Sequence, residues 1–352
     1  MMRSFFLLAL SSMFSLGCSS VHGVEDAAVP DAALADGAVP DADPVFVPPD
    51  AGSLRCAFGS AERFGGEPCF CYGDAALGSG YLYRQTVGVE IWDVRDASAP
   101  VLAGNIEGDT GTQGGVAVVG DRLISATSFP PGVRLYGLAD PASPTLLHEL
   151  SLGERRVSDA AVAGARVAVA LEEAGVVEVA ALDLEADVLT ERWRASVGDS
   201  IVGLFADADR VFVFAGRFPP HELWLVTLDA GSGEVLAEQR VHDSAAPLVD
   251  AWLEADRLLA VFDHTLLELD VVGAPEERRR IELPFYASAI TRRGAQLAIG
   301  GSELALLDPD SLEVTHRLDQ GTGDRASLFF LEDALVYSNQ GGVASVALVC
   351  AP

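Results

Sequence analysis

Short runs of apolar residues, each ending in a polar turn, follow one another along most of the chain. The run VEIWDVRDASAPVL at residues 89–102 is a clear example, because β-branched and aromatic residues lead into a turn of Asp, Ala and Ser before apolar residues return. We interpret it as a strand, a tight turn and the start of a second strand. The run VRLYGLADPASPTL begins 44 residues later, at residue 133, and has Val, Asp, Pro and Leu at the same four positions. A fixed period of about 40 residues is typical of repeat proteins.

Further copies of this landmark strand follow at a similar spacing. Each is preceded by a pair of short strands, for example GGVAVVGDRLISATS at residues 114–128, which contains a Gly-Asp turn. One unit therefore has an inner strand that is apolar on both faces, a second strand, the landmark strand, and an outer strand with charged residues, such as residues 145–152. Four strands repeated around a ring form a β-propeller blade. The later copies of the landmark strand are at residues 176–189, 222–236, 265–279, 303–317 and 341–350.

The seven copies predict an all-β fold: a seven-bladed β-propeller of four-stranded antiparallel blades that spans residues 53–352. In most copies an Asp follows a large apolar residue. Because an Asp at the end of a strand accepts hydrogen bonds from the amides of the next turn, we interpret it as a turn residue. The pairs Asp207/Asp209 and Asp308/Asp310 have the same interpretation, since they lack the Gly and distal Glu of a calcium loop. The landmark Asp residues are Asp93, Asp183, Asp229, Asp270 and Asp308.

The N-terminus predicts export. Arg3 precedes an apolar run at residues 5–16 that is too short to cross a bilayer comfortably, so residues 1–17 are interpreted as a signal peptide. Ser15-Leu16-Gly17-Cys18 resembles a bacterial lipobox at Gly17 and Cys18 and departs from it at the first two positions. The resemblance implies cleavage before Cys18 and lipidation of this residue, which would anchor the protein. The alternative is ordinary cleavage further on, for instance after Gly23, which would release a soluble protein.

Residues 18–52 consist largely of Ala, Asp, Pro and Val without an apolar period. Such a segment buries too little surface to order itself, and its prolines and like charges keep it extended. Together with a lipidated Cys18, it is expected to be a disordered tether that lifts the propeller off the membrane.

Four further cysteines bear on how the ring closes. The last copy of the landmark strand ends at the C-terminus, so its outer strand must come from elsewhere, and residues 53–59 are the natural donor. In an exported chain Cys56, Cys69, Cys71 and Cys350 are expected to form two disulfides. Two residues apart in a strand, Cys69 and Cys71 would be about 6.5–7 Å apart, near the limit for a disulfide. We therefore expect Cys350 to bond Cys69 or Cys71, although the donor strand would place Cys56 near Cys350. A redox or metal role for Cys69 and Cys71 is the competing hypothesis.

Two units resemble a known family in detail. The run GVAVVGD at residues 115–121, followed by residues 133–144, and the run IWDVRDASAP at residues 91–100 are similar to the LVIVD repeat of bacterial surface propellers. The resemblance covers residues 81–153, and the other copies match mainly by period. It implies an extracytoplasmic β-propeller and no particular reaction.

Charge and motifs exclude several functions. The 23 basic residues, all Arg, face 52 acidic ones, and a formal net charge of −29 disfavours nucleic acid and anionic lipid as partners. No HExxH, GxSxG or GK[ST] motif is present. A metal-dependent lactonase-like hydrolase would need ligands from several blades at the central channel, and the sequence assigns none. We expect no cofactor and no metal. The six histidines are His22, His148, His221, His242, His264 and His316.

The loops between second and third strands are the candidate binding sites. SFPPG at residues 128–132 and RFPPH at residues 217–221 both place an aromatic residue before two prolines, which stiffen the loop. Arg and aromatic residues on one face of an acidic chain predict a recognition surface. In the alternative, the Phe side chains plug the blade ends and the Arg side chains pair with local carboxylates. The candidate binding face contains Arg84, Phe129, Arg155, Arg156, Arg217, Phe218, His221, Phe285, Tyr286 and Arg325.

These features together predict a monomeric, membrane-anchored extracytoplasmic module that binds a protein or glycan of the cell envelope without catalysis. The lipid on Cys18 is its expected membrane contact. Ser19 in place of Asp after the lipidated Cys favours the outer membrane by analogy with bacterial sorting. An envelope assembly scaffold and a metal-dependent hydrolase are the alternatives.

Overall fold

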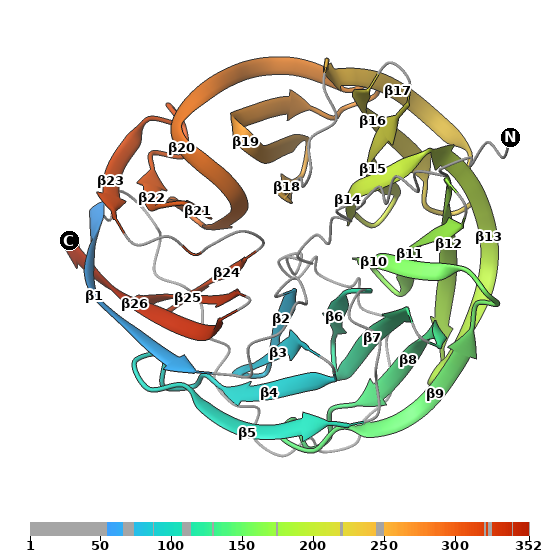
Figure 1. Cartoon of the computed structure of the whole chain (residues 1–352), viewed down its shortest axis with the longest axis horizontal. Coiled ribbons are helices and arrows are strands. Elements are labelled where there is room, and N and C mark those ends of the chain that lie inside the picture. The colour runs from blue at the N-terminus through green and yellow to red at the C-terminus, as the bar shows by residue number, and fades with distance from the viewer. Residues whose placement is uncertain are drawn as a thin grey trace, which may run out of the picture.

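The structure, a computed structural model, describes residues 55–65, 74–86, 88–107, 114–128, 130–173, 175–218, 221–243, 250–319, 322, 326–339 and 341–351. In these ranges the regular secondary structure is β, and the sheets stand radially around a central axis, with one end strand near the axis and the other at the rim (Figure 1). This arrangement is the predicted β-propeller. The predicted signal peptide, Cys18 and the tether lie outside the described residues.

The described residues form six sheets, five of them four-stranded. From the axis outward, sheet I contains β2 (Ala75–Gly78), β3 (Tyr81–Gln85), β4 (Val89–Asp93) and β5 (Val101–Ile106). In the same outward order, sheet II contains β6 (Val116–Val119), β7 (Arg122–Ser128), β8 (Pro131–Gly137) and β9 (Thr145–Ser151). Sheet III contains β10 (Arg156–Ala163), β11 (Arg166–Glu173), β12 (Val176–Glu185) and β13 (Val188–Gly198). Sheet IV contains β14 (Ser200–Ala206), β15 (Arg210–Arg217), β16 (Glu222–Asp229) and β17 (Val235–His242). Sheet VI contains β24 (Ser327–Leu331), β25 (Ala334–Asn339), β26 (Gly342–Ala351) and β1 (Arg55–Gly65).

Sheet V has six strands and corrects the predicted count of seven separate blades. β19 pairs with β18 through residues 257–261 and with β20 through residues 263–270, while β20 pairs with β21 from residue 287 onward. The two repeat units expected in this region are therefore joined in one sheet. The reason is that β20 runs as one continuous strand from the rim to the axis, without a separate loop between the two units (Figure 1). The strands are β18 (Asp250–Glu254), β19 (Arg257–Asp270), β20 (Glu276–Arg293), β21 (Gln296–Gly301), β22 (Leu304–Leu307) and β23 (Val314–Leu318).

The first and last strands of the described chain close the ring. β1 pairs antiparallel with β26, so the predicted strand donor around residues 53–59 is confirmed over its described part. Cys56 lies opposite Cys350 in this register and the two form a disulfide. The favoured pairing of Cys350 with Cys69 or Cys71 is thus wrong, because strand register, rather than spacing along the chain, decides which cysteines meet. Cys69 and Cys71 lie outside the described residues.

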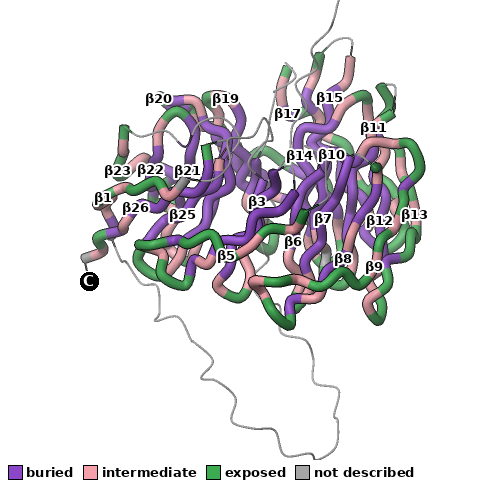
Figure 2. Tube along the Cα trace, turned by 60° about the horizontal axis from the view of Figure 1, so that its bottom comes forward, coloured by how far each residue is buried: buried purple, intermediate pink, exposed green. Residues whose placement is uncertain are grey.

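The hydrophobic core lies in layers between successive sheets, and the exposed residues follow the rim and the turns (Figure 2). The predicted burial of inner and middle strands is confirmed, for example by Leu123 and Ile124 in β7. One layer lies inside sheet V, where Leu259 and Val261 share a cluster with Ile299. Each such side chain contributes about 1.5–3 kcal/mol on burial, so the layers hold the ring together.

A recurring arginine links neighbouring units at one side of the ring. The second strands of four successive units begin with Arg, and each guanidinium reaches the turn between the third and fourth strands of the next unit. Arg122 Nε donates to Asp187 Oδ1 at 2.6 Å, and Arg166 Nη1 donates to the Ala230 carbonyl oxygen at 2.6 Å. In the same way Arg210 donates to the Val271 carbonyl oxygen and Arg257 to that of Pro309.

The landmark carboxylates have the predicted role in turns. Asp229 Oδ1 accepts a hydrogen bond from the Ser232 N–H at 2.7 Å, and Asp308 Oδ1 accepts one from the Ser311 N–H at 2.8 Å. Asp207 Oδ1 accepts one from the Arg210 N–H at 2.7 Å. Asp183 differs, because it accepts hydrogen bonds from the side chains of Arg166 and Arg192.

Candidate functional site on the upper face

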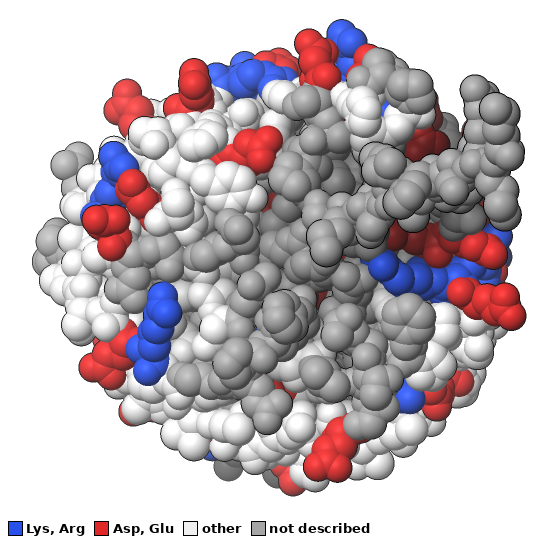
Figure 3. All heavy atoms as spheres, in the orientation of Figure 1, with Lys and Arg blue, Asp and Glu red and all other residues white. Residues whose placement is uncertain are grey.

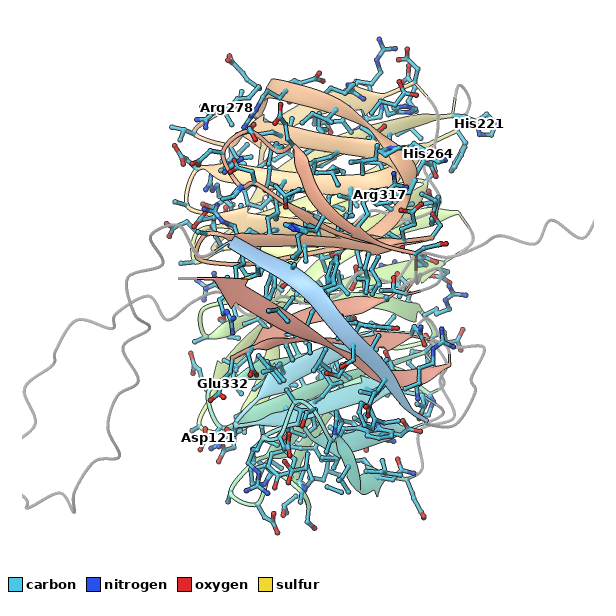
Figure 4. The ribbon with its side chains drawn as sticks, turned by 90° about the vertical axis from the view of Figure 1, so that its left-hand side faces the viewer. Asp121, His221, His264, Arg278, Arg317 and Glu332 are labelled. Carbon is cyan, nitrogen blue, oxygen red and sulfur yellow. A yellow bond between two sulfur atoms is a disulfide. The ribbon has the colours of Figure 1, made fainter. Side chains whose placement is uncertain are left out.

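The two faces of the ring carry different connections. We call the upper face the one formed by the connections from second to third strands and from one unit to the next. The lower face carries the turns between first and second strands. Figure 4 shows His221 and His264 on the upper face and Asp121 and Glu332 on the opposite, lower face.

Arg84 does not belong to the exposed surface, contrary to the sequence prediction. Its side chain is fully buried and pairs with Glu90, with 2.7 Å between Nη1 and Oε2. Its Nη2 donates to the Asn339 carbonyl oxygen at 2.8 Å, which links sheet I to sheet VI, and the Trp92 indole N–H donates to the same Glu90 carboxylate. The pattern of apolar and polar residues along the chain does not show how deeply a long polar side chain is buried. In the structure, the neighbouring sheet VI covers Arg84.

Arg155 and Arg156 lie between sheets II and III, on the upper face. Arg155 is 30% exposed and pairs with Glu173, at 3.1 Å, and with Glu178. Arg156 lies 3.5 Å from Glu172, whose pKa is raised because burial penalises its charged form. Both arginines are therefore held by carboxylates, as the alternative interpretation expects. Figure 3 shows basic and acidic side chains next to one another at the rim of this face.

Sheet IV presents the hairpin between β15 and β16. The rings of Phe218 and His221 meet edge to face with 4.8 Å between centroids, and His221 has a left-handed φ of 69°. The Phe218 N–H donates to Asp199 Oδ2 at 2.7 Å, which fixes the base of the hairpin. The ends of β15 and β17 project beyond the body of the ring (Figure 2).

Arg217 is held at the same hairpin by two contacts. Its guanidinium lies over the Trp224 ring at 4.4 Å from the centroid and forms an ion pair of 2.8 Å with Glu238. Cation–π and ion-pair contacts of this kind fix the orientation of a partly exposed arginine. The structure therefore brings together the predicted residues Arg217, Phe218 and His221.

The remaining residues of the predicted binding face differ in how far they are exposed. Phe285 is 3% exposed and lies under the Arg317 guanidinium, so it belongs to the hydrophobic core and not to the exposed face. Tyr286 is partly exposed, and its ring meets that of His264 edge to face with 6.4 Å between centroids. Phe129 and Arg325 lie outside the described residues.

A set of polar residues near the axis was not predicted. Asp74 precedes β2, Asp159 lies within β10 and Asp250 begins β18, and all three are at most 4% exposed. Asp74 Oδ2 accepts the Val116 N–H at 3.0 Å, and Asp250 Oδ2 accepts the Ile290 N–H at 2.8 Å.

Asp74 and Asp250 therefore each link one inner strand to the next. Burial raises the pKa of Asp74 well above its usual range, and the negative charge of Asp250 adds to the effect. Asp-Ala recurs in or next to three inner strands, at residues 74, 159 and 250, and this was the sequence signal that could have found them.

Within the described ranges there is no group of three or more His, Cys, Asp or Glu side chains that could hold a metal ion. The same ranges contain no helix long and apolar enough to cross a membrane. The metal-dependent hydrolase hypothesis thus gains no support from the axis.

The radial sheets and the loop-bearing upper face define a β-propeller protein. Among solved structures, the chain is similar to the β-propeller domain of Cps50 (Swd1) from Myceliophteria thermophila, with a TM-score of 0.61 and 14% identity over 83% of this chain and 99% of that one. It is also similar to the computationally designed Ika8 protein, with a TM-score of 0.58 and 13% identity over 79% of this chain and 83% of that one. At these identities the likeness shows the fold alone. No family model and no curated protein matches the sequence.

Proposed function

We propose that the chain is a non-catalytic binding module of the cell envelope. In this proposal it is exported, lipidated at Cys18, held on the tether of residues 18–52, and recognises a protein or glycan with its upper face. The LVIVD-like pattern at residues 81–153 supports the extracytoplasmic location, and the β-propeller fold supports a binding role in general.

The hairpin around Arg217 and Phe218 is the observation that carries the binding proposal. Arg and aromatic side chains dominate the energetics of protein interfaces. In this hairpin they are oriented before any partner arrives, because Trp224 and Glu238 hold Arg217 and the Asp199 carboxylate holds the Phe218 N–H. Preorganisation reduces the entropy lost on binding.

The direction of β1 supports an upper face that is free to bind. β26 starts at Gly342, after an upper-face connection, and runs to Ala351 at the lower face. Since β1 is antiparallel to β26 and Arg55 pairs with Ala351, the described chain enters the ring from the lower face. A tether attached there would leave the upper face unobstructed.

Crosslinking in envelope fractions tests the binding proposal. The mature chain, the R217A/F218A variant and a control R192A are compared; Arg192 is an exposed arginine of the lower side that also pairs with a carboxylate. We expect the mature chain and R192A to capture the same partner and R217A/F218A to lose it. Equal capture by all three proteins, or by none, would refute the proposal. Lipidation is tested separately by detergent phase partitioning, where a C18S variant should move to the aqueous phase.

A further inference from the structure

A polar pocket opens at the outer edge of the upper face, between sheets IV and V. Its lining is the end of β17 with the residue after it, Arg240, Val241, His242 and Asp243, together with Arg280 of β20. Its volume is about 310 Å³, which is within the range of small-ligand sites. We call it the rim pocket. It is separate from the hairpin around Arg217, although β17 is the outer strand of the same sheet.

Two guanidinium groups line the rim pocket, and each is held by a carboxylate outside the lining; Arg240 Nη1 also lies 3.4 Å from Asp243 Oδ1, inside it. Arg240 Nη1 lies 2.9 Å from Glu222 Oε1. Arg280 donates through Nε and Nη2 to Glu277, and through Nη2 to the Val241 carbonyl oxygen at 2.7 Å. Within the described ranges, Nε and Nη2 of Arg240 and Nη1 of Arg280 have no hydrogen-bond acceptor. The donors of two fixed cations therefore remain available at one site.

The charge of the lining favours an anion. The lining contains two arginines and a single carboxylate, that of Asp243, which is 86% exposed and so can rotate into solvent. A groove of about 300 Å³ on the lower face differs from the rim pocket in this respect, because its two arginines, Arg166 and Arg192, share the carboxylate of Asp183. In that groove one carboxylate is bonded to both arginines, whereas the carboxylate in the rim pocket lining lies 3.4 Å from Arg240 and is paired with no second arginine of the lining.

We propose that the rim pocket binds a carboxylate group of a ligand. A planar carboxylate matches the fork of an arginine side chain. A monoanion is preferred to a phosphate dianion because Glu222, Glu277 and Asp243 stand close by and would repel a second charge. The inference extends the proposed function, since it gives the upper face a chemical preference; it does not depend on the hairpin around Arg217.

Titration calorimetry at low ionic strength tests the rim pocket with matched ligands. Glucuronate is compared with glucose, and N-acetylglutamate amide with N-acetylglutamine amide, so each pair differs in its acidic group. We expect the acids to bind at least 10-fold more tightly than their neutral partners, and the arm that binds more tightly shows whether the carboxylate belongs to a sugar or to a peptide. Inorganic phosphate is expected to bind more weakly than the better acid.

Variants of the full mature chain locate the binding. R240Q and R280Q should each weaken it at least 10-fold, while the control R192Q leaves it unchanged. Equal affinity for acid and neutral ligands, no binding up to 50 mM, tighter binding of phosphate, or unchanged affinity in both variants overturns the proposal. Thermal melts confirm that the variants are folded. R217A/F218A changes no residue of the pocket lining, and R240Q and R280Q change no residue of the hairpin, so failure of the calorimetric test and failure of the crosslinking experiment are distinguishable.

Discussion

Replacing Cys56 and Cys350 together by alanine removes the bond that joins β1 to β26. The two residues are 294 positions apart, so the disulfide closes almost the whole described ring. In the chain-entropy model the constraint on the unfolded state is about −2.1 − 1.5R ln n cal/mol/K, which for a loop of this size gives about 5–6 kcal/mol at 25 °C. For a domain of about 300 residues the unfolding entropy is about 0.6 kcal/mol/K, so the midpoint of thermal unfolding should fall by about 9 °C.

Differential scanning calorimetry of the wild type and of C56A/C350A, each with and without reducing agent, measures this effect. The wild type should lose about 9 °C on reduction, and C56A/C350A should melt at the lower temperature under both conditions. A further fall of the double variant on reduction would reveal a contribution from Cys69 and Cys71. A double variant that melts within 2 °C of the oxidised wild type would show that strand pairing alone closes the ring, and the entropic reasoning would be refuted.

Three further predictions concern buried or interlocking charges. Burial raises the pKa of Asp74, so the stability that its protonated form contributes is complete below the unfolded pKa of about 4. This stability is lost as the pH rises towards the folded pKa. Asp74→Asn should remove this loss, so that the free energy of unfolding, measured by urea titration, changes less between pH 4 and 8. Arg84→Met leaves Glu90 buried without its cation and should cost about 3–5 kcal/mol in the same assay, and adding Glu90→Gln should recover part of it. Arg166→Met should cost about 1–3 kcal/mol, because it breaks a link to the next sheet. Arg194→Met, which removes an ion pair with Glu191 of the same strand, should cost less; equal losses would contradict the inter-sheet role.

The repeat pattern predicted the fold because each strand carries its own signal. Apolar residues at alternate or continuous positions and a polar turn every few residues are local properties, and they placed β4 and β8 correctly. The number of separate sheets is not local. Two units share a sheet when the segment that connects them, such as residues 282–287, continues as a strand that pairs with both. The side-chain pattern carries little information about this backbone pairing.

The site was predicted less well, because contacts between sheets decide it. The aromatic-Pro-Pro signal led to Phe218 and His221, which the structure does bring together. The same argument grouped Phe285 with them, although that side chain is buried. The carboxylates near the axis were missed because Asp at the edge of a strand also forms turns, and only the neighbouring inner strand shows which role applies to Asp74.

Arginine shows most clearly how position within the repeat sets a role. Since the chain has no lysine, every inter-sheet cation link, every cation–π contact and every exposed cation must come from this one side chain. An arginine that begins a second strand, such as Arg122, reaches the next unit at the lower face. An arginine near the end of a second strand reaches the upper face, where its neighbours decide the outcome: Asn339 and Glu90 enclose Arg84, whereas Trp224 supports Arg217 with part of its guanidinium in solvent. We therefore expect substitutions at Arg84 and at the lower-face arginines that reach the next unit to change stability, whereas the proposed function expects those at Arg217 to change binding.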